Sequence, residues 1–117
     1  MVKCLNIFNY INIYLNIVPP QISAFSFGDE PINSGETVST TCAATKGDNP
    51  LEFSWFFNGQ PIASLNKPEI LISINKRRST LDIEAVNAGH SGEYACTVSN
   101  RAGAASHSAV LAINGKN

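Results

Sequence analysis

The sequence predicts an all-β domain in which two antiparallel sheets pack face to face as a sandwich. Short runs of strand-forming residues recur along the chain and are divided by turns rich in Gly, Pro and Asn, a pattern typical of β-sandwiches. No helical period of apolar residues appears beyond the first 17 positions. In addition, a single Trp at position 55 lies between Cys42 and Cys96, and Tyr94 precedes Cys96 by two residues.

The first two strands are expected on either side of a turn at Asn33-Ser34-Gly35. Residues 22–27 suit an edge strand, because Pro19 and Pro20 precede them and Pro is tolerated at a sheet edge. Gly and Pro in residues 28–31 end this strand. Residues 37–45 form the next strand, in which the period of two turns every second side chain inward. The inward residues are Val38, Thr40, Cys42 and Ala44.

The third strand, residues 51–57, follows a loop at residues 46–50 and ends in a hairpin turn. Leu51, Phe53 and Trp55 are expected on the same side as the cysteines. Asn58-Gly59 is the sharpest hairpin signal in the chain, since both residue types accept a positive φ. Residues 62–65 are expected to add a short strand beyond this turn.

The second half of the chain continues the pattern. The strands expected there are residues 70–74, 80–85, 92–99 and 104–113. Lys76-Arg77-Arg78 is expected to be a solvated turn before the second of them. In residues 80–85, Leu81 and Ile83 point inward, while Asp82 and Glu84 point outward.

Cys42, Trp55, Tyr94 and Cys96 have the Cys…Trp…Cys spacing and the tyrosine corner of an immunoglobulin-like sandwich. In that fold one Cys from each facing sheet bridges the core, and the indole packs against the sulfurs. The Tyr94 ring enters the core, because residues i and i+2 share one face of a strand, and its hydroxyl can reach backbone near residues 89–90. The alternative is that two free thiols and an aromatic ring share the core by chance.

A disulfide between Cys42 and Cys96 would close a loop of 96 − 42 = 54 residues. In the chain-entropy account, such a bond stabilises the fold by roughly 4 kcal/mol. It also implies an oxidising compartment. Leu81 is expected to join Trp55 and Tyr94 in the core, and Cys4 is left without a partner in this scheme.

The residues around these positions resemble an I-set immunoglobulin domain of a cell-adhesion molecule. Besides Cys42 and Trp55, the resemblance rests on Leu81-Asp82-Ile83, Gly92-Glu93-Tyr94-Ala95-Cys96 and Asn100-Arg101-Ala102-Gly103. Further stretches are similar to the arthropod Dscam family, above all to its seventh immunoglobulin domain, which alternative exons encode, and to the first domain of shortened chelicerate Dscams. These stretches are Pro19-Pro20-Gln21-Ile22, Phe25-Ser26-Phe27-Gly28, Gly47-Asp48-Asn49-Pro50 and Ser106-His107-Ser108-Ala109-Val110-Leu111. The resemblance covers residues 19–115.

The resemblance implies an extracellular recognition module at the cell surface, carried by a larger membrane-anchored receptor. It further implies homophilic, isoform-specific binding that serves self-recognition between neurites, with a second role in immunity. The alternative is a structural spacer with no binding role of its own, as in the tandem I-set arrays of giant muscle proteins. Those arrays are cytosolic, and Cys42 and Cys96 would then be reduced thiols.

If the module pairs with itself, the resemblance points to the outer face of the sheet formed by residues 22–27, 37–45, 80–85 and 70–74. The candidate interface residues are Ser39, Thr41, Ala43, Arg78, Thr80, Asp82 and Glu84. An antiparallel two-fold pairing centred near Leu81 would set Arg78 of one copy against Glu84 of the other. The plainer interpretation is a solvated hairpin beside an ordinary charged strand.

One position departs from the family pattern. The usual motif is Asp-x-Gly-x-Tyr-x-Cys, and here His90 stands in place of the Asp. In the wider superfamily that Asp often pairs with an Arg, so no such pairing of Arg77 or Arg78 with position 90 is expected. Accordingly, His90→Asp is predicted to be neutral or mildly stabilising, with a change of no more than about 1 kcal/mol in the free energy of unfolding.

Composition and motifs give no support to catalysis, a cofactor or a polyanionic partner. The net charge of −1 offers no electrostatic argument for nucleic acid or an anionic membrane. His90 and His107 are the only histidines, and neither adjoins a nucleophile motif. The chain has no CxxC, HExxH or Gly-rich phosphate loop. We expect no enzyme, no cofactor, no metal and no small-molecule substrate.

Residues 1–17 are predicted to lie outside the domain, which spans residues 18–115. Lys3 followed by an apolar run is typical of a secretory signal peptide. However, four Asn residues interrupt the run, and no small-x-small cleavage site precedes Pro19. A poorly cleaved amphipathic leader and an artefact of the gene model remain as alternatives, and the run is too short and polar for a membrane span.

Overall fold

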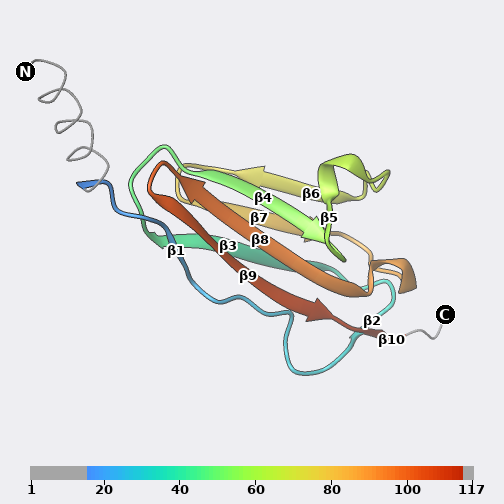
Figure 1. Ribbon diagram of the computed structural model, residues 1–117. Coiled ribbons are helices and arrows are strands. Elements are labelled where there is room, and N and C mark those ends of the chain that lie inside the picture. The colour runs from blue at the N-terminus through green and yellow to red at the C-terminus, as the bar shows by residue number, and fades with distance from the viewer. Residues whose placement is uncertain (1–15, 115–117) are drawn as a thin grey trace, which may run out of the picture.

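Two four-stranded sheets lie face to face in the structure, a computed structural model that describes residues 16–114 (Figure 1). The first sheet has the order β1 (Gln21–Ile22), β3 (Val38–Lys46), β7 (Arg78–Ile83), β6 (Ile70–Ile74). The second has the order β5 (Gln60–Pro61), β4 (Glu52–Phe57), β8 (Gly92–Asn100), β9 (Gly103–Leu111). The predicted all-β sandwich is confirmed, while most of the predicted leader, residues 1–15, lies outside the described residues.

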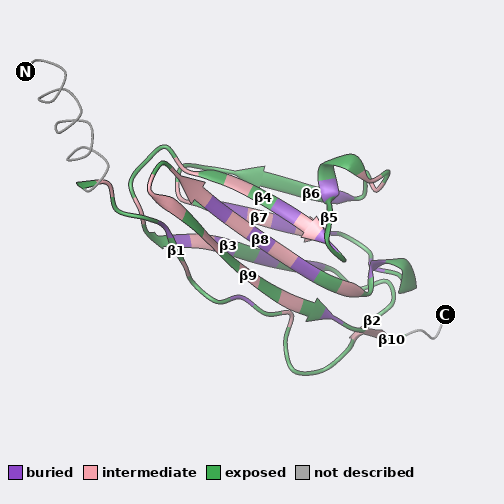
Figure 2. Ribbon diagram, in the orientation of Figure 1, coloured by how far each residue is buried: buried purple, intermediate pink, exposed green. Residues whose placement is uncertain are grey.

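The core between the sheets follows the predicted alternation of side chains. In β3, buried residues alternate with more exposed ones from Val38 to Ala44, and β8 shows the same alternation from Tyr94 to Val98. Figure 2 shows these buried bands on strands of both sheets. Leu81 of β7 is completely buried. The period of two therefore places one face of each sheet in the core and leaves the other face to solvent.

A disulfide between Cys42 of β3 and Cys96 of β8 joins the two sheets, as predicted. Trp55 of β4 lies directly opposite Cys96 in the strand register and is 4% exposed. The Tyr94 hydroxyl donates a hydrogen bond of 2.7 Å to the backbone oxygen of His90. This bond fastens the turn before β8 to the core and forms the tyrosine corner.

The first predicted strand is shorter than expected. Only its start is paired, in β1 and through the Ser23 N–H, which donates to the Ala43 carbonyl oxygen, and residues 24–27 leave the first sheet. Phe25 and Phe27 explain the change, because their rings turn into the core, 5.5 Å from the Trp55 ring and 5.4 Å from the Tyr94 ring. The chain then forms β2 (Ile32–Asn33), which pairs in parallel with β10 (Ile113–Asn114), a pairing that the sequence did not predict.

The hairpin at Asn58-Gly59 is present, with φ of 49° and 84° at its two residues and Phe57 opposite Gln60. The strand predicted at residues 62–65 is wrong. In its place lies a 3₁₀ helix, η1 (Ile62–Ser64), whose Ile62 side chain is buried. The Ser64 hydroxyl donates to the Pro61 carbonyl oxygen and supports this turn.

The strand at residues 70–74 is confirmed as β6, but the turn after it is tighter than predicted. Arg78 was expected in a solvated turn and instead begins β7, which ends at Ile83. The side-chain oxygen of Asn75 accepts hydrogen bonds from the backbone N–H groups of Arg77 and Arg78. This Asn side chain closes the hairpin within residues 75–77. A further short 3₁₀ helix, η2 (Ala88–His90), precedes β8.

Candidate functional site

The strand register sets the candidate residues of β3 and β7 in rows on the outer face of the first sheet. Ser39 lies opposite Asp82, Thr41 opposite Thr80, and Ala43 opposite Arg78. The Thr41 and Thr80 hydroxyl oxygens lie 3.2 Å apart and share a hydrogen bond. Because Cys42 and Leu81 between these rows are fully buried, the rows point to solvent. Ser39, Thr41, Arg78 and Glu84 are exposed, and Ala43, Thr80 and Asp82 are half-buried.

β6 extends the same rows toward the margin of the sheet. Leu71 lies opposite Asp82, and Ser73 lies opposite Thr80. Leu71 is 60% exposed, so the face carries a large apolar side chain that sequence reasoning missed. The signal was available in the alternation of residues 70–74, since an inward Ile70 requires an outward Leu71.

Charges on this face are separated along β7. Arg78 lies at the start of the strand and Asp82 near its end, with Glu84 just beyond the last residue. The backbone oxygen of Glu84 accepts a 2.7 Å hydrogen bond from the Thr37 hydroxyl, which fixes the chain there. The side chain of Glu84 remains exposed. One end of the face is therefore basic and the other acidic.

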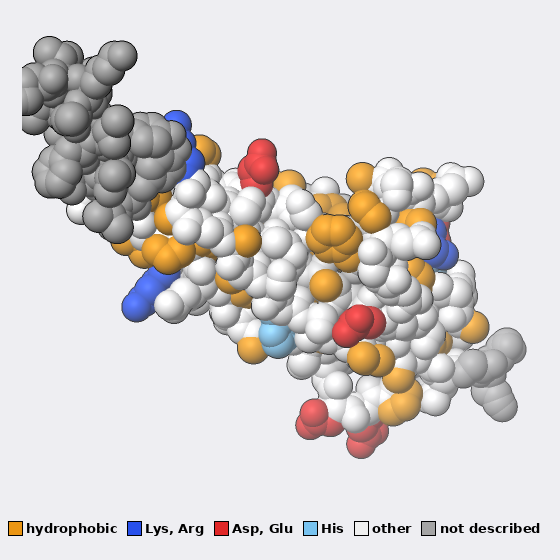
Figure 3. All heavy atoms as spheres, viewed as in Figure 1, with side chains coloured by type: hydrophobic (Ala, Val, Ile, Leu, Met, Phe, Trp, Pro, Cys, Tyr) orange, Lys and Arg blue, Asp and Glu red, His pale blue; other side chains and the backbone are white. Residues whose placement is uncertain are grey.

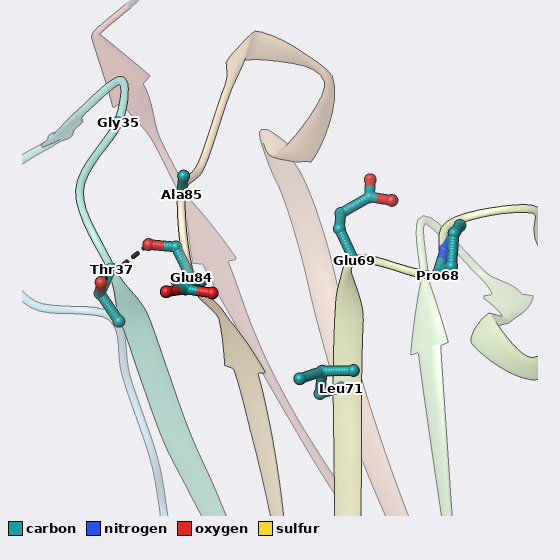
Figure 4. Close-up of a pocket in the computed structure, with 7 residues that line it drawn as sticks. All are labelled: Gly35, Thr37, Pro68, Glu69, Leu71, Glu84 and Ala85. Atoms are coloured by element: carbon teal, nitrogen blue, oxygen red, sulfur yellow. Dashed lines mark hydrogen bonds between the residues drawn. The ribbon is translucent and has the colours of Figure 1, made fainter.

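The acidic end contains an open hollow of about 690 Å³. Figure 4 shows Thr37, Glu84 and Leu71 around it, with Glu69 at the start of β6. The remaining lining comes from Gly35, Pro68 and Ala85. With two carboxylates and the apolar side chains of Leu71, Pro68 and Ala85, the hollow suits a cationic side chain that has an apolar stem.

His90 lies in η2 with its side chain only 1% exposed, and the expectation for this residue needs correction. Its Nδ1 accepts a hydrogen bond from the Asn87 N–H, 3.0 Å away, so Nε2 carries the proton. Nε2 donates to the Glu69 carboxylate at 2.8 Å. Because both ring nitrogens have partners in a buried site, His90→Asp is expected to destabilise the fold, in contrast to the nearly neutral change expected from the sequence. Arg77 instead donates to the carbonyl oxygens of Gly47 and Ala44.

The contacts of Glu69 stabilise the ionised form of its carboxyl group. A backbone hydrogen bond and the hydrogen bond from His90 hold the pKa of the Glu69 carboxyl below its usual value. Since folding lowers this pKa, the stabilisation is present above the ordinary carboxyl range and is lost as the pH falls through the lowered pKa. Burial also raises the pKa of Tyr94, so its hydroxyl stays protonated and continues to donate to His90.

Two further polar groups are fastened within or beside the core. The Trp55 indole N–H donates to the Ser79 hydroxyl at 2.8 Å, and Ser79 is completely buried. Sequence reasoning missed Ser79, although the inward alternation of Leu81 and Ile83 extends back to it. His107 of β9 places Nε2 2.8 Å from the Phe25 carbonyl oxygen and packs its ring against the Phe25 ring. His107 is thus a satisfied structural histidine.

The rest of the described surface offers no comparable chemistry. Figure 3 views the molecule over β4, β8 and β9, where the charged side chains do not gather into one patch. Within residues 16–114, no three His, Cys, Asp or Glu side chains come together as metal ligands. No helical segment in this part of the chain has the length and apolar character needed to cross a membrane. The outer face of the first sheet is therefore the candidate site.

Comparison with known sequences relates this fold to one family. The family described as immunoglobulin domain matches residues 19–100. Cell adhesion molecule Dscam1 of Drosophila melanogaster is 41% identical over 98 residues, which make up 84% of this chain and 5% of that protein. Cell adhesion molecule DSCAML1 of Homo sapiens is 32% identical over 96 residues, 82% of this chain and 4% of that protein. The chain thus spans no more than 5% of the length of these relatives.

Solved structures of the same fold also superpose on this chain. The crystal structure of the Dscam1 Ig7 domain, isoform 5, superposes with a TM-score of 0.78 at 38% identity and covers 83% of this chain and 98% of that one. An I-band fragment of titin superposes with a TM-score of 0.70 at 26% identity, covering 81% of this chain and 32% of the fragment. The sandwich fold is thus shared with a non-enzymatic family, and the chain belongs to that family, the immunoglobulin domains, as a relative of the Dscam cell adhesion molecules.

Proposed function

We propose that the chain is an extracellular adhesion module that binds a second copy of itself through the outer face of the β1-β3-β7-β6 sheet. The names of the relatives, which are cell adhesion molecules, support an adhesive role. In this proposal the binding is homophilic and isoform-specific, and it serves recognition between cells, including neuronal self-recognition and immunity. Because fold alone does not give such a function, the support must come from the chemistry of the outer face of this sheet.

Small hydroxyl side chains make up the centre of this face. Ser39, Thr41 and Thr80 lie between the larger side chains of Arg78 at one end and Leu71 at the other, so two sheets can approach closely at the centre. Burying Thr41 and Thr80 costs less than burying two unpaired hydroxyl groups, because the two share a hydrogen bond. The centre therefore favours contact with another flat surface over the binding of a small molecule.

The separation of charge along β7 is the observation that carries the proposal. When two copies meet face to face and antiparallel about an axis near Leu81, Arg78 of each copy faces Glu84 of the other. The basic end of one face then covers the acidic hollow of the other, where Glu69 and Leu71 also lie. Each such charge pair contributes only about 1 kcal/mol, and its main effect is on partner choice and association rate.

A spacer role is the second candidate, and the likeness to a titin I-band fragment favours it. A spacer needs no self-association. A cytosolic spacer would also hold Cys42 and Cys96 as thiols. Titrating the free thiols of material purified from a secreting host, without reductant, separates the two environments.

Charge reversal tests the proposed face by sedimentation velocity of the 117-residue chain. Arg78→Glu alone and Glu84→Arg alone should each weaken self-association by about tenfold, because each places like charges across the axis. The double variant restores opposite charges in every pair and should recover binding. A mixture of the two single variants should also associate, as a heterodimer.

Glu93→Arg is the matched control, since Glu93 is exposed on β8 of the other sheet. It should leave self-association unchanged. If the double variant stays as weak as the single ones, the Arg78–Glu84 pairing is wrong. If no version of the chain associates at any accessible concentration, the spacer role is the better account.

A further inference from the structure

β6 forms one margin of the first sheet, at the top of the sandwich in Figure 1, and pairs only with β7 among the described strands. Three of the five exposed large apolar side chains in the described part of the chain belong to it. They are Leu71 at 60%, Ile72 at 37% and Ile74 at 60% exposure. β6 therefore concentrates apolar surface at a sheet margin, where unpaired backbone groups also lie.

The exposure of Ile72 and Ile74 has a structural cause. Both lie on the inner side of the sheet, opposite Leu81 and Ser79, which are fully buried. The facing sheet ends on this side in β5, which is two residues long and pairs only with Phe56 and Phe57. Short β5 leaves the inner side of β6 without a complete cover, so these two side chains reach solvent.

The backbone alternation shows which groups of β6 face outward at the margin. The Asn75 N–H donates to the Arg78 carbonyl oxygen, which continues the β6–β7 ladder. In an antiparallel ladder every second residue turns its N–H and C=O to the same neighbour. Ser73 and Leu71 therefore bond to β7, while Ile72 and Ile74 direct their backbone groups away from it. The Ile70 N–H already donates to Lys67, so Ile70 offers only its carbonyl.

We propose that β6 pairs edge to edge with β6 of a second copy, antiparallel about a two-fold axis at Ile72. Ile72 then exchanges two hydrogen bonds with its counterpart, and each Ile74 N–H donates to the Ile70 carbonyl of the other copy. The pairing is isologous and leaves neither β6 margin unpaired, so the assembly stops at a dimer. This surface is distinct from the outer face described above.

Side chains and charges complement one another in this register. Ile74 of each copy meets Ile70 of the other, and Leu71 meets Ser73, so apolar surface is covered from both sides. Glu69 precedes the strand and Lys76 follows it, so antiparallel pairing brings the acidic end of one strand beside the basic end of the other. β6 itself has no charge, no Pro and no bulge that would discourage edge pairing.

Edge pairing would join two four-stranded sheets into one and leave both outer faces open. A pair of modules would then present two copies of the recognition face side by side. Two linked faces bind an opposing pair more tightly than either face alone, through effective concentration. The edge contact thus adds a lateral interaction to the face contact, and neither excludes the other.

Amide hydrogen exchange on the oxidised 117-residue chain tests the proposal most directly. From dilute to concentrated solution, the amides of Ile72 and Ile74 should slow by about tenfold as the dimer comes to dominate. The amides of Leu71 and Ser73 already bond to β7 and serve as internal controls that change little. If Ile72 and Ile74 exchange equally fast at both concentrations, the proposal is wrong.

Substitutions distinguish pairing through the β6 margin from pairing through the outer face of the sheet. Ile74→Lys should weaken dimerisation by at least about tenfold, because a lysine at the margin opposes strand pairing. Val110→Lys changes a side chain of similar exposure, 66%, on β9 and should have no effect. Thr41→Arg should block the outer face yet preserve the slowed exchange of Ile72 and Ile74. Loss of that slowing in Thr41→Arg, or open-ended oligomers in place of dimers, would overturn edge pairing while leaving the face proposal standing.

Discussion

A buried histidine is tolerated in a turn only when both ring nitrogens find partners, and His90 meets that condition. The Asn87 N–H and the Glu69 carboxylate supply those partners from opposite sides of the ring. The Asn87 side chain also accepts a hydrogen bond from the Gly89 N–H. Together with the bond from the Asn87 N–H to His90, this forms a reciprocal cap at the N-terminus of η2. Tyr94 then bonds to the His90 backbone, which links this turn to the core.

Replacing His90 by Asp should destabilise the fold. An Asp side chain is too short to reach both partners, and it would place a buried carboxylate beside the exposed carboxylate of Glu69. We expect a loss of about 2 kcal/mol or more, the cost of unsatisfied buried polar groups. Urea unfolding followed by Trp55 fluorescence measures it. Equal stability of variant and parent would show that the His90 contacts contribute nothing.

Glu69→Gln is the matched control for this residue. The amide oxygen can still accept from His90 Nε2, so stability at neutral pH should fall less than in His90→Asp. The parent should lose stability as the pH drops through the lowered pKa of Glu69. The Gln variant lacks that titrating group, so its free energy of unfolding should fall less steeply with decreasing pH in the same experiment.

The sequence predicts the long strands well and the connections poorly, for a physical reason. Strands β3, β7 and β8 follow from the period of two, because one side of each faces the core. Residues 24–27 and 62–65 also carry large apolar side chains, yet the first segment leaves the sheet and the second forms a 3₁₀ helix. Their structure depends on which core gap the side chains fill, and that gap exists only once both sheets are in place. Glu69 was missed for the same reason, since the path of residues 62–69 brings it to His90.

Gly92 at the start of β8 is an element-scale constraint that can be tested. Its φ is +156°, and a Cβ there would lie 2.7 Å from the Asn58 side-chain oxygen and 2.8 Å from the Phe57 ring. The Glu93 N–H beside it donates to that same Asn58 oxygen. Gly92→Ala should therefore push the β4 hairpin away from β8 and cost about 2–3 kcal/mol in unfolding free energy.

Gly28→Ala separates backbone strain from steric conflict. Gly28 also has a positive φ, +98°, but nothing lies within 4 Å of an added Cβ. It should lose only about 1 kcal/mol, the backbone term alone. Similar losses in the two variants would mean that the contact with Phe57 and Asn58 relaxes freely.

At the scale of the whole molecule, the two sheets contribute differently to the core and to the candidate binding surfaces. The β5-β4-β8-β9 sheet supplies Trp55 and Tyr94 to the core, and the β1-β3-β7-β6 sheet carries the outer face and the β6 margin. Alternation and family resemblance could predict the face, because Ser39, Thr41 and Asp82 are outward in any such register. The exposed margin could not be predicted, since it follows from the sheet order and from the shortness of β5. Within residues 16–114, the disulfide is the one covalent link between the layers that side chains make.

Removing that link by changing both Cys42 and Cys96 to Ala should cost about 2–5 kcal/mol. The closed loop has 54 residues, so the oxidised unfolded chain is much more restricted than the variant. Because total domain stability is commonly about 5–15 kcal/mol, the variant should unfold at a markedly lower temperature. Thermal and urea unfolding of parent and variant measure the loss. Reduced parent is the control, since it retains both sulfur atoms in the core and isolates the effect of the bond from the effect of packing. If reduced parent and variant are both as stable as oxidised parent, the packing of Trp55, Tyr94 and Leu81 alone holds the sheets together, and a reducing environment would suit the chain equally well.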